Sequence, residues 1–217
     1  MIHGLPGVVA DVQIDGGSVD QQVASGEVVG PLEVAAGQHE VSLLPADGDP
    51  VTGTVEAAEG ASIDMVAHLP ASQGDPAVLT AFPNDLTPVG PGKSRLAVGH
   101  TAQVPPADIR VDGEPLLVNV ANAEVLTVEV PAQSYSVDIV ATGTTSPSVY
   151  GPVDVAVEAG TLTRVFAVGS PEGSTMDAIV HELPVEQQGS SEPARVDTGT
   201  GGQAAALLAG RTAAGGR

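Results

Sequence analysis

A chain of 217 residues without cysteine forms neither disulfides nor thiolate metal sites, and its length fits two domains better than one large core. It carries 27 acidic residues against 7 basic ones, and a field of this sign repels phosphate backbones, so we expect no nucleic-acid binding. No segment reaches the roughly 18 to 20 consecutive apolar residues of a membrane helix, and no signal peptide is visible, so we expect no membrane insertion.

The composition favours β-structure. Hydrophobic residues make up 42% of the chain, dominated by Val, Ala and Leu, whereas there are only two Tyr, two Phe and no Trp. The 27 glycines and 18 prolines are scattered along the chain as turn residues would be. A valine-rich interior interrupted at short intervals predicts many short strands and turns.

The first unit, residues 1–85, contains 13 acidic residues and neither Lys nor Arg. Its first strand is short, because only Met1-Ile2 precedes His3. We therefore expect that the natural chain continues upstream and that this unit has a truncated first strand. Further along, His39, Val41 and Leu43 alternate with polar residues, which is typical of a half-buried strand.

A Pro- and Gly-rich linker, residues 86–94, is expected to join this unit to a second one at residues 95–185. In the second unit Tyr135, Val137 and Ile139 again alternate with polar residues, and Asp112-Gly113 is a turn signal. The pattern predicts seven strands, near 95–100, 108–112, 124–130, 134–141, 153–157, 161–169 and 176–183.

The two units are related by an internal repeat with a period near 97 residues. The segment from His3 to Gly16 aligns without gaps on the segment from His100 to Gly113. Three more blocks follow in the same order: 34–41 matches 130–137, 59–67 matches 159–167, and 77–83 matches 178–184. A period this long indicates that each copy is a whole domain rather than one repeat of a solenoid.

Seven short strands per copy with regular turns predict an all-β fold: two tandem immunoglobulin-like or prealbumin-like β-sandwich domains. Tyr135 lies two residues before an inward strand position, which is the spacing of a tyrosine corner; His39 takes this place in the first copy. Residues 186–217 are rich in Gly, Ala, Ser and Thr and are expected to form a disordered, low-complexity C-terminal tail.

The sequence offers little chemistry. No nucleophile motif, phosphate loop, dinucleotide fingerprint or zinc spacing is present, so we expect no catalytic residues, no metal and no cofactor. The best polar constellation is a repeated pair, His3 with Asp11 and His100 with Asp108. A carboxylate that holds an imidazole prepares a ligand-binding site, a metal ligand or a base. The alternative is a hydrogen bond that pins the Pro-rich loop to the next strand.

The repeated blocks resemble the domain of unknown function 4397 family. The resemblance lies in His3 to Gly16, His100 to Gly113, Val130 to Val137, and the joint from Leu86 to Lys93. It departs from the family pattern at His39, where an aromatic residue is usual, and at Gln133, where Gly is usual. The family is bacterial, often actinobacterial, and typically carries tandem copies, so the resemblance implies export and surface display.

Together these observations predict a protein that is not an enzyme. We expect a secreted or cell-surface module for structural display or protein interaction, located outside the cell or in the cell envelope. Its partner would be a protein or cell-wall component, and strand addition at the truncated edge could produce a homo-oligomer. One alternative is a domain that binds a ligand or cation, either calcium or a basic polymer, through the acidic first unit. Another is a hydrolase built on the His–Asp pairs.

Overall fold

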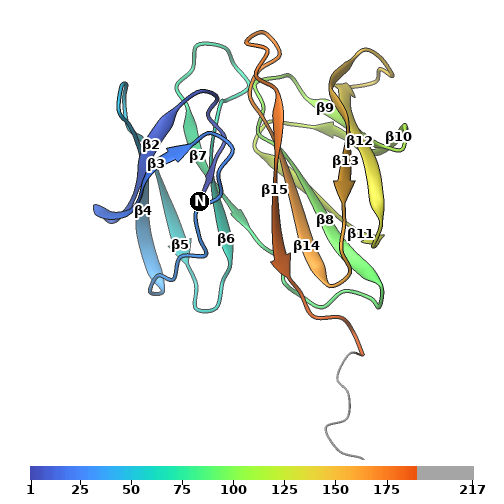
Figure 1. Ribbon diagram of the computed structural model, residues 1–217, viewed down its shortest axis with the longest axis horizontal. Helices are drawn as coiled ribbons and strands as arrows, with labels where there is room; N and C mark the ends of the chain where they lie inside the picture. Colours follow the sequence, from blue (N-terminus) through green and yellow to red (C-terminus); the bar gives the residue numbers. More distant parts are fainter. Residues whose placement is uncertain (190–217) are drawn as a thin grey trace, which may run out of the picture.

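The computed structural model describes residues 1–189, and its regular structure there consists of fifteen β-strands without a helix (Figure 1). The first half contains β1 (Ile2–His3), β2 (Val9–Ile14), β3 (Gly17–Ala24), β4 (Gly37–Pro45), β5 (Val51–Ala57), β6 (Ile63–His68) and β7 (Val78–Pro83). The second half contains β8 (Lys93–His100), β9 (Ala107–Val111), β10 (Glu114–Val120), β11 (Glu124–Pro131), β12 (Ser134–Ala141), β13 (Ser148–Ala156), β14 (Thr161–Val168) and β15 (Asp177–Pro184).

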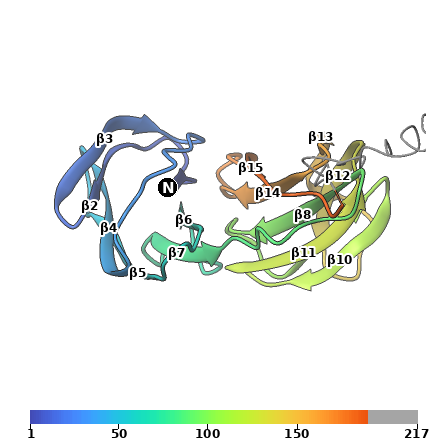
Figure 2. The same cartoon turned by 90° about the horizontal axis from the view of Figure 1, so that it is seen from below.

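These strands form two β-sandwiches that lie side by side (Figures 1 and 2). Sandwich 1 pairs the sheet β1-β6-β7 with the sheet β3-β2-β4-β5. Sandwich 2 pairs the sheet β11-β8-β14-β15 with the sheet β10-β9-β12-β13. The expected all-β, two-sandwich architecture is confirmed.

The strand order distinguishes between the two expected kinds of sandwich. With the strands of sandwich 2 lettered A to H, its sheets read D-A-G-H and C-B-E-F, and A runs parallel to G. An immunoglobulin constant domain has sheets A-B-E-D and C-F-G instead. The order is therefore that of a prealbumin-like sandwich. In sandwich 1 the place of β11 is taken by a single bridge between Val28 and Ile2.

The strand registers agree with the first three repeat blocks and correct the last one. Ile2 pairs with Val66 as Gly99 pairs with Phe166, which matches the alignment of residues 59–67 on 159–167. On the last strand, however, Asp64 lies opposite Phe82 and Arg164 lies opposite His181. Phe82 and His181 are therefore equivalent positions. The sequence alignment of 77–83 on 178–184 instead places position 82 on position 183, two residues further along. Because side chains of a strand repeat every two residues, apolar blocks shifted by two still match.

All seven strands expected in the second half are present, and an eighth, β10, was missed. β10 lies at a sheet edge, its pairing with β9 is interrupted by two register shifts, and most of its side chains are exposed or half-buried. An edge strand with bulges loses the regular alternation by which strands are recognised. β8 begins at Lys93, inside the expected linker. The expected tail at 186–217 lies, from residue 190 on, outside the described residues.

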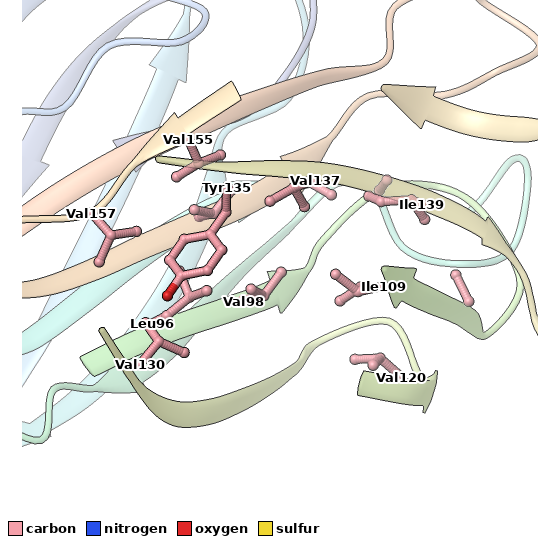
Figure 3. Packing of buried hydrophobic residues seen from close by; sticks show 14 of the residues in the cluster. Leu96, Val98, Ile109, Val120, Val130, Tyr135, Val137, Ile139, Val155 and Val157 are labelled. Atoms are coloured by element: carbon pink, nitrogen blue, oxygen red, sulfur yellow. The ribbon is translucent and has the colours of Figure 1, made fainter. Parts of the chain in front are cut away.

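The tyrosine corner of sandwich 2 is confirmed. The Tyr135 hydroxyl donates a hydrogen bond of 2.8 Å to the carbonyl oxygen of Pro131, four residues upstream. Its ring lies in the core of sandwich 2 beside Leu96, Val130 and Val157 (Figure 3). The turn expected at Asp112-Gly113 has both residues at positive φ, 52° and 83°, as a two-residue hairpin turn requires.

A third cluster of buried apolar residues lies between the sandwiches. Sandwich 1 contributes Ile2, Val66 and Phe82, and sandwich 2 contributes Phe166, Val168 and Ile179. The rings of Phe82 and Phe166 meet with centroids 5.4 Å apart at an angle of 49°. The strands β6, β8 and β14 are thus buried along most of their length on both faces, once in their own sandwich and once in the contact between the sandwiches.

Gly99 on β8 fits this contact because it has no side chain. A Cβ at Gly99 would lie 2.6 Å from the nearest ring atom of Phe166, which is fully buried. The backbone of β8 therefore forms one wall of the site that holds the Phe166 ring.

The Phe166→Ala variant should lose about 3–5 kcal/mol of unfolding free energy, because it leaves a cavity at the centre of the contact between the sandwiches. Urea denaturation followed by circular dichroism measures this loss. The control is Val118→Ala on β10, whose side chain is 61% exposed and whose loss should cost less than about 0.5 kcal/mol. Equal effects of the two variants would mean that the contact contributes nothing.

Candidate functional site

The structure does not bring the repeated histidines and aspartates together. Within residues 1–189, neither His3 nor His100 is hydrogen-bonded to its expected carboxylate partner. The Nδ1 of His3 accepts the backbone N–H of Leu5 at 3.4 Å, and the Nε2 of His100 lies 3.2 Å from the carbonyl oxygen of Pro105. Both side chains are buried, so solvent does not reach the imidazoles. The expectation of His–Asp hydrogen bonds is wrong.

Instead, the two aspartates bind backbone N–H groups of the neighbouring edge strand, at the points where its pairing is irregular. Asp11 accepts the backbone N–H of Gln22 at 2.9 Å, and Asp108 accepts the backbone N–H of Asn119 at 2.8 Å. Gln22 and Asn119 have positive φ values of 57° and 55°, and they lie at equivalent positions of β3 and β10. Each carboxylate therefore satisfies a backbone amide that a register shift leaves without a strand partner. This repeated role is structural.

The charged cluster that the structure does assemble lies between the sandwiches. Arg164 of β14 is 2% exposed, and its Nη1 lies 3.3 Å from the Oδ2 of Asp64 on β6. The Nδ1 of His181 on β15 lies 3.1 Å from the Oδ1 of the same carboxylate. Asp64 and Arg164 occupy equivalent positions in the two repeats, so one position carries opposite charges in the two copies.

The Arg164 guanidinium contacts sandwich 1 through hydrogen bonds and an aromatic ring as well as through the ion pair. Its Nη1 donates to the carbonyl oxygens of Phe82 at 3.1 Å and Pro83 at 3.3 Å, and to the side chain of Asn84. Its carbon atom lies 5.0 Å from the ring centroid of Phe166 and 5.9 Å from that of Phe82. A planar guanidinium stacks on aromatic rings while its edge donates hydrogen bonds, which an ammonium group does less well.

Burial alone would raise the pKa of the Asp64 carboxyl, but the His181 imidazole and the Arg164 guanidinium hold that pKa below its ordinary value. Burial lowers the pKa of Arg164, although a guanidinium remains protonated in a protein. The pair is therefore ionised inside the contact, and removal of either charge would leave the other buried without compensation.

His39 replaces the tyrosine of the corner in sandwich 1. Its Nε2 lies 2.7 Å from the carbonyl oxygen of Ala35, again four residues upstream, and its Nδ1 lies 2.7 Å from the Oδ2 of Asp15. Both neighbours are acceptors, an arrangement that favours the protonated imidazole. The hydrogen bond to Asp15 raises the pKa of His39 accordingly.

A groove of about 570 Å³ opens in sandwich 1 next to this histidine. Its lining includes residues of the segment from Val28 to Val34, Ile63–Met65 of β6, and His39, Val41 and Val55. His181 to Pro184 of sandwich 2 also line it. The groove is mostly apolar, and its acidic groups are Asp64 and Glu182. It is larger than the hollow of about 360 Å³ that residues of both sandwiches line near Leu5 and Ser170.

The described residues contain neither a metal-binding cluster nor a membrane-spanning helix. In this part of the chain, no three His, Cys, Asp or Glu side chains are grouped so that they could hold a metal ion. Across residues 1–189 no helix is long and apolar enough to cross a membrane.

Sequence reasoning missed Asp64, Arg164 and His181 because their grouping depends on how the sandwiches pack. One signal was available: the repeat places an acid and a base at the same position of the same strand, within otherwise apolar residues. The groove could be anticipated from the short first strand.

A comparison with protein-family models assigns the chain to a family. The model described as "Domain of unknown function (DUF4397)" matches residues 1–110, which span sandwich 1 and the first strands of sandwich 2. Because this match covers half of the chain, the protein belongs to the DUF4397 family. No curated protein matches the sequence.

The Asp64→Asn variant should lose about 3–5 kcal/mol of unfolding free energy, because it leaves the Arg164 cation buried without its counter-ion. The matched control is Lys93→Ala, which breaks the exposed ion pair between Lys93 and Glu129 and should cost less than about 1 kcal/mol. Urea denaturation of both variants measures the difference. A loss below about 1 kcal/mol for Asp64→Asn would mean that the Asp64–Arg164 ion pair does not stabilise the contact between the sandwiches.

Acidification should destabilise the protein below pH 6.5. Burial lowers the pKa of His3, His68 and His100, so the folded state takes up these protons less readily than the unfolded state. Their contribution is fully present above the ordinary imidazole pKa of 6.5 and is lost as the pH falls below it, by about 1.4 kcal/mol per pH unit for each proton. The raised pKa of His39 has the opposite sign, and its contribution is lost as the pH rises through that pKa.

Thermal melting between pH 8 and pH 5 measures this dependence. His68 is bonded as a neutral imidazole, with the carbonyl oxygen of Leu69 at 3.0 Å from Nδ1 and the hydroxyl of Thr80 at 2.9 Å from Nε2. The His68→Gln variant should therefore show a smaller loss of melting temperature on acidification than the parent protein. A parent melting temperature that stays constant from pH 7 to pH 5 would refute the assignment of neutral buried histidines.

Proposed function

We propose that this protein is a non-catalytic module of a secreted or cell-surface protein, and that it serves in structural display or protein interaction. The observation that carries the proposal is the buried contact between the sandwiches, in which Phe82, Phe166 and the Asp64–Arg164 pair hold two β-sandwiches in a fixed arrangement. A fixed pair of sandwiches suits a spacer or a binding surface, since neither sandwich has to be ordered when a partner binds.

The use of the polar side chains supports the same proposal. The aspartates repeated in both copies bind backbone amides of edge strands, and the buried histidines bind backbone groups or a threonine. Catalysis needs a group aimed at a substrate with its partners within reach. These side chains are instead directed at the protein's own backbone.

A second candidate function, cation binding, rests on the surface of sandwich 1. Of the 13 acidic residues in positions 1–85, all but Asp11 and Asp64 are exposed, and no Lys or Arg lies in the same stretch. Such a surface attracts cations and basic polymers. Calcium needs several oxygen ligands converging at about 2.3–2.6 Å, and the exposed acids offer charge without such a cluster.

Location is the most direct test of the display proposal. Antibodies against the purified protein should label intact cells of the organism that produces it, or should detect the protein in the culture medium. The control is a cytoplasmic protein of the same cells, which should be labelled only after permeabilisation. Labelling of our protein only after permeabilisation would contradict the proposal.

Titration calorimetry separates the two candidate functions. Under the display proposal, millimolar calcium should produce no heat of binding and no rise in melting temperature. Polylysine should bind only at low ionic strength, with an affinity that falls steeply as salt is added. Saturable calcium binding that persists in 0.15 M salt would favour the cation-binding alternative.

A further inference from the structure

One edge strand of sandwich 2 is regular, and within residues 1–189 no strand pairs with its outer side. β11 pairs with β8 over all eight of its residues, from Glu124 to Pro131, without a register shift. It is the last strand of its sheet, and Figure 2 shows it on the side of sandwich 2 opposite β15. Every second residue of an edge strand directs its N–H and C=O away from the sheet, so β11 offers backbone donors and acceptors to another extended chain.

Other edges of the two sandwiches are interrupted or covered. β3, β10 and β13 pair with their neighbours through register shifts, and such bulges hinder the addition of a further strand. β5 lies against β7, where a Cβ at Gly53 would come within 2.9 Å of the Leu79 side chain. β15 is regular, but its end from His181 to Pro184 lines the groove of sandwich 1. β11 is therefore a long, regular edge on the outside of the described residues.

The side chains of β11 are only partly covered. Five of its eight residues are exposed. Leu126 lies opposite Val98, a core residue of sandwich 2, yet the Leu126 side chain is 37% exposed. An apolar side chain that faces the core and still meets water is stabilised when another strand extends the sheet over it.

The acidic groups of β11 are engaged within the chain. Glu129 forms an ion pair with Lys93 at 3.4 Å, and the Oε2 of Glu124 accepts the backbone N–H of Ala121 at 2.8 Å. The strand therefore presents backbone groups and apolar side chains more than uncompensated charge. A second copy of the same strand satisfies both kinds of group.

One register suits two copies of β11. Residues that lie opposite each other in an antiparallel pair point to the same face, and the faces alternate along a strand. A two-fold axis between identical strands therefore passes between one residue and its own copy. With the axis at Thr127, residues 124 to 130 are all paired, as Thr127 with Thr127, Leu126 with Val128, Val125 with Glu129, and Glu124 with Val130.

This register avoids two costs. No two like charges lie directly opposite each other, an arrangement that would be destabilising. An axis at Val128 would bring Pro131 into the pairing, and proline has no N–H to donate. An axis at Leu126 would shorten the paired segment. The sequence of β11 is thus self-complementary about Thr127.

From these observations we propose that β11 is a self-assembly surface, at which two copies of this chain pair antiparallel about Thr127 and join their sheets β11-β8-β14-β15 into one continuous sheet. The partner is a second copy of the chain, and the contact lies in sandwich 2, away from the short first strand of sandwich 1. This inference goes beyond the display function and holds wherever the protein is located.

Light scattering of the full chain tests the assembly. The measured mass should rise from that of one chain toward that of two between micromolar and roughly millimolar concentration. The net charge of −20 makes two copies repel, so the dimer should become at least tenfold tighter between about 0.05 M and 1 M salt. A mass of one chain under all these conditions would overturn the proposal, as would assemblies larger than two, because a two-fold contact closes at the dimer.

Opposite charges at Thr127 test the register. Thr127→Asp places two carboxylates opposite each other, and Thr127→Lys places two ammonium groups there, so each variant alone should dimerise at least tenfold more weakly than the parent. An equal mixture of the two variants should restore the dimer. The matched control is Thr52→Asp on β5, which is also exposed and should leave dimerisation unchanged. A mixture that dimerises no better than its components would overturn the pairing about Thr127.

Hydrogen exchange of the unaltered chain gives a test that needs no substitution. The backbone amides of β11 should exchange more slowly at millimolar than at micromolar concentration, because the outward N–H groups become hydrogen-bonded in the dimer. The amides of β10, an edge of the opposite sheet, should exchange equally at both concentrations. Unchanged exchange in β11, in a sample that light scattering shows to be dimeric, would mean that the copies meet elsewhere and that the proposal is wrong.

Discussion

The arrangement of this protein depends on one buried cation. The Arg164 side chain extends from β14 of sandwich 2 toward sandwich 1 and lies against the rings of Phe82 and Phe166. Its guanidinium contacts the Asp64 carboxylate and carbonyl oxygens of sandwich 1. Burying a guanidinium is costly unless its charge and its N–H groups are satisfied. Here the Asp64 carboxylate, the faces of Phe82 and Phe166 and the carbonyl oxygens of Phe82 and Pro83 compensate for part of the loss of water, whereas the Nε of Arg164 has no hydrogen-bond partner among the described residues. Except for Phe166, these groups reach Arg164 only when the sandwiches are together.

The repeat explains how such a contact arises. Two copies of one domain present equivalent sheets to each other, so equivalent strand positions meet near the contact. A position with the same charge in both copies would bring like charges together in a region of low polarity. Asp64 and Arg164 show the alternative, in which the two copies differ in charge and attract. Whether such a pair adds net stability over apolar residues varies between proteins, but it does fix which faces match.

Much of the fold could be predicted from the sequence because strands and turns leave local signals. Three local signals were sufficient to predict two sandwiches and the tyrosine corner: the alternation around Tyr135, the Asp112-Gly113 turn and the repeat. β10 was missed because bulges at an edge disrupt the alternation. The repeated His–Asp pairs were misjudged for a physical reason: a carboxylate beside a bulge is held by the nearest free amide, which sequence spacing does not reveal. The charged cluster needed the packing of two domains, about 100 residues apart in the chain.

We expect the two sandwiches to unfold as one unit because the Arg164 contact joins them. Differential scanning calorimetry of the full chain at pH 7 tests it most directly. A single transition whose calorimetric enthalpy equals its van't Hoff enthalpy is the predicted result, because neither sandwich should unfold while the other keeps the contact buried. Two resolved transitions, each with the enthalpy of about half the chain, would contradict it and would mean that the sandwiches are joined only by the linker.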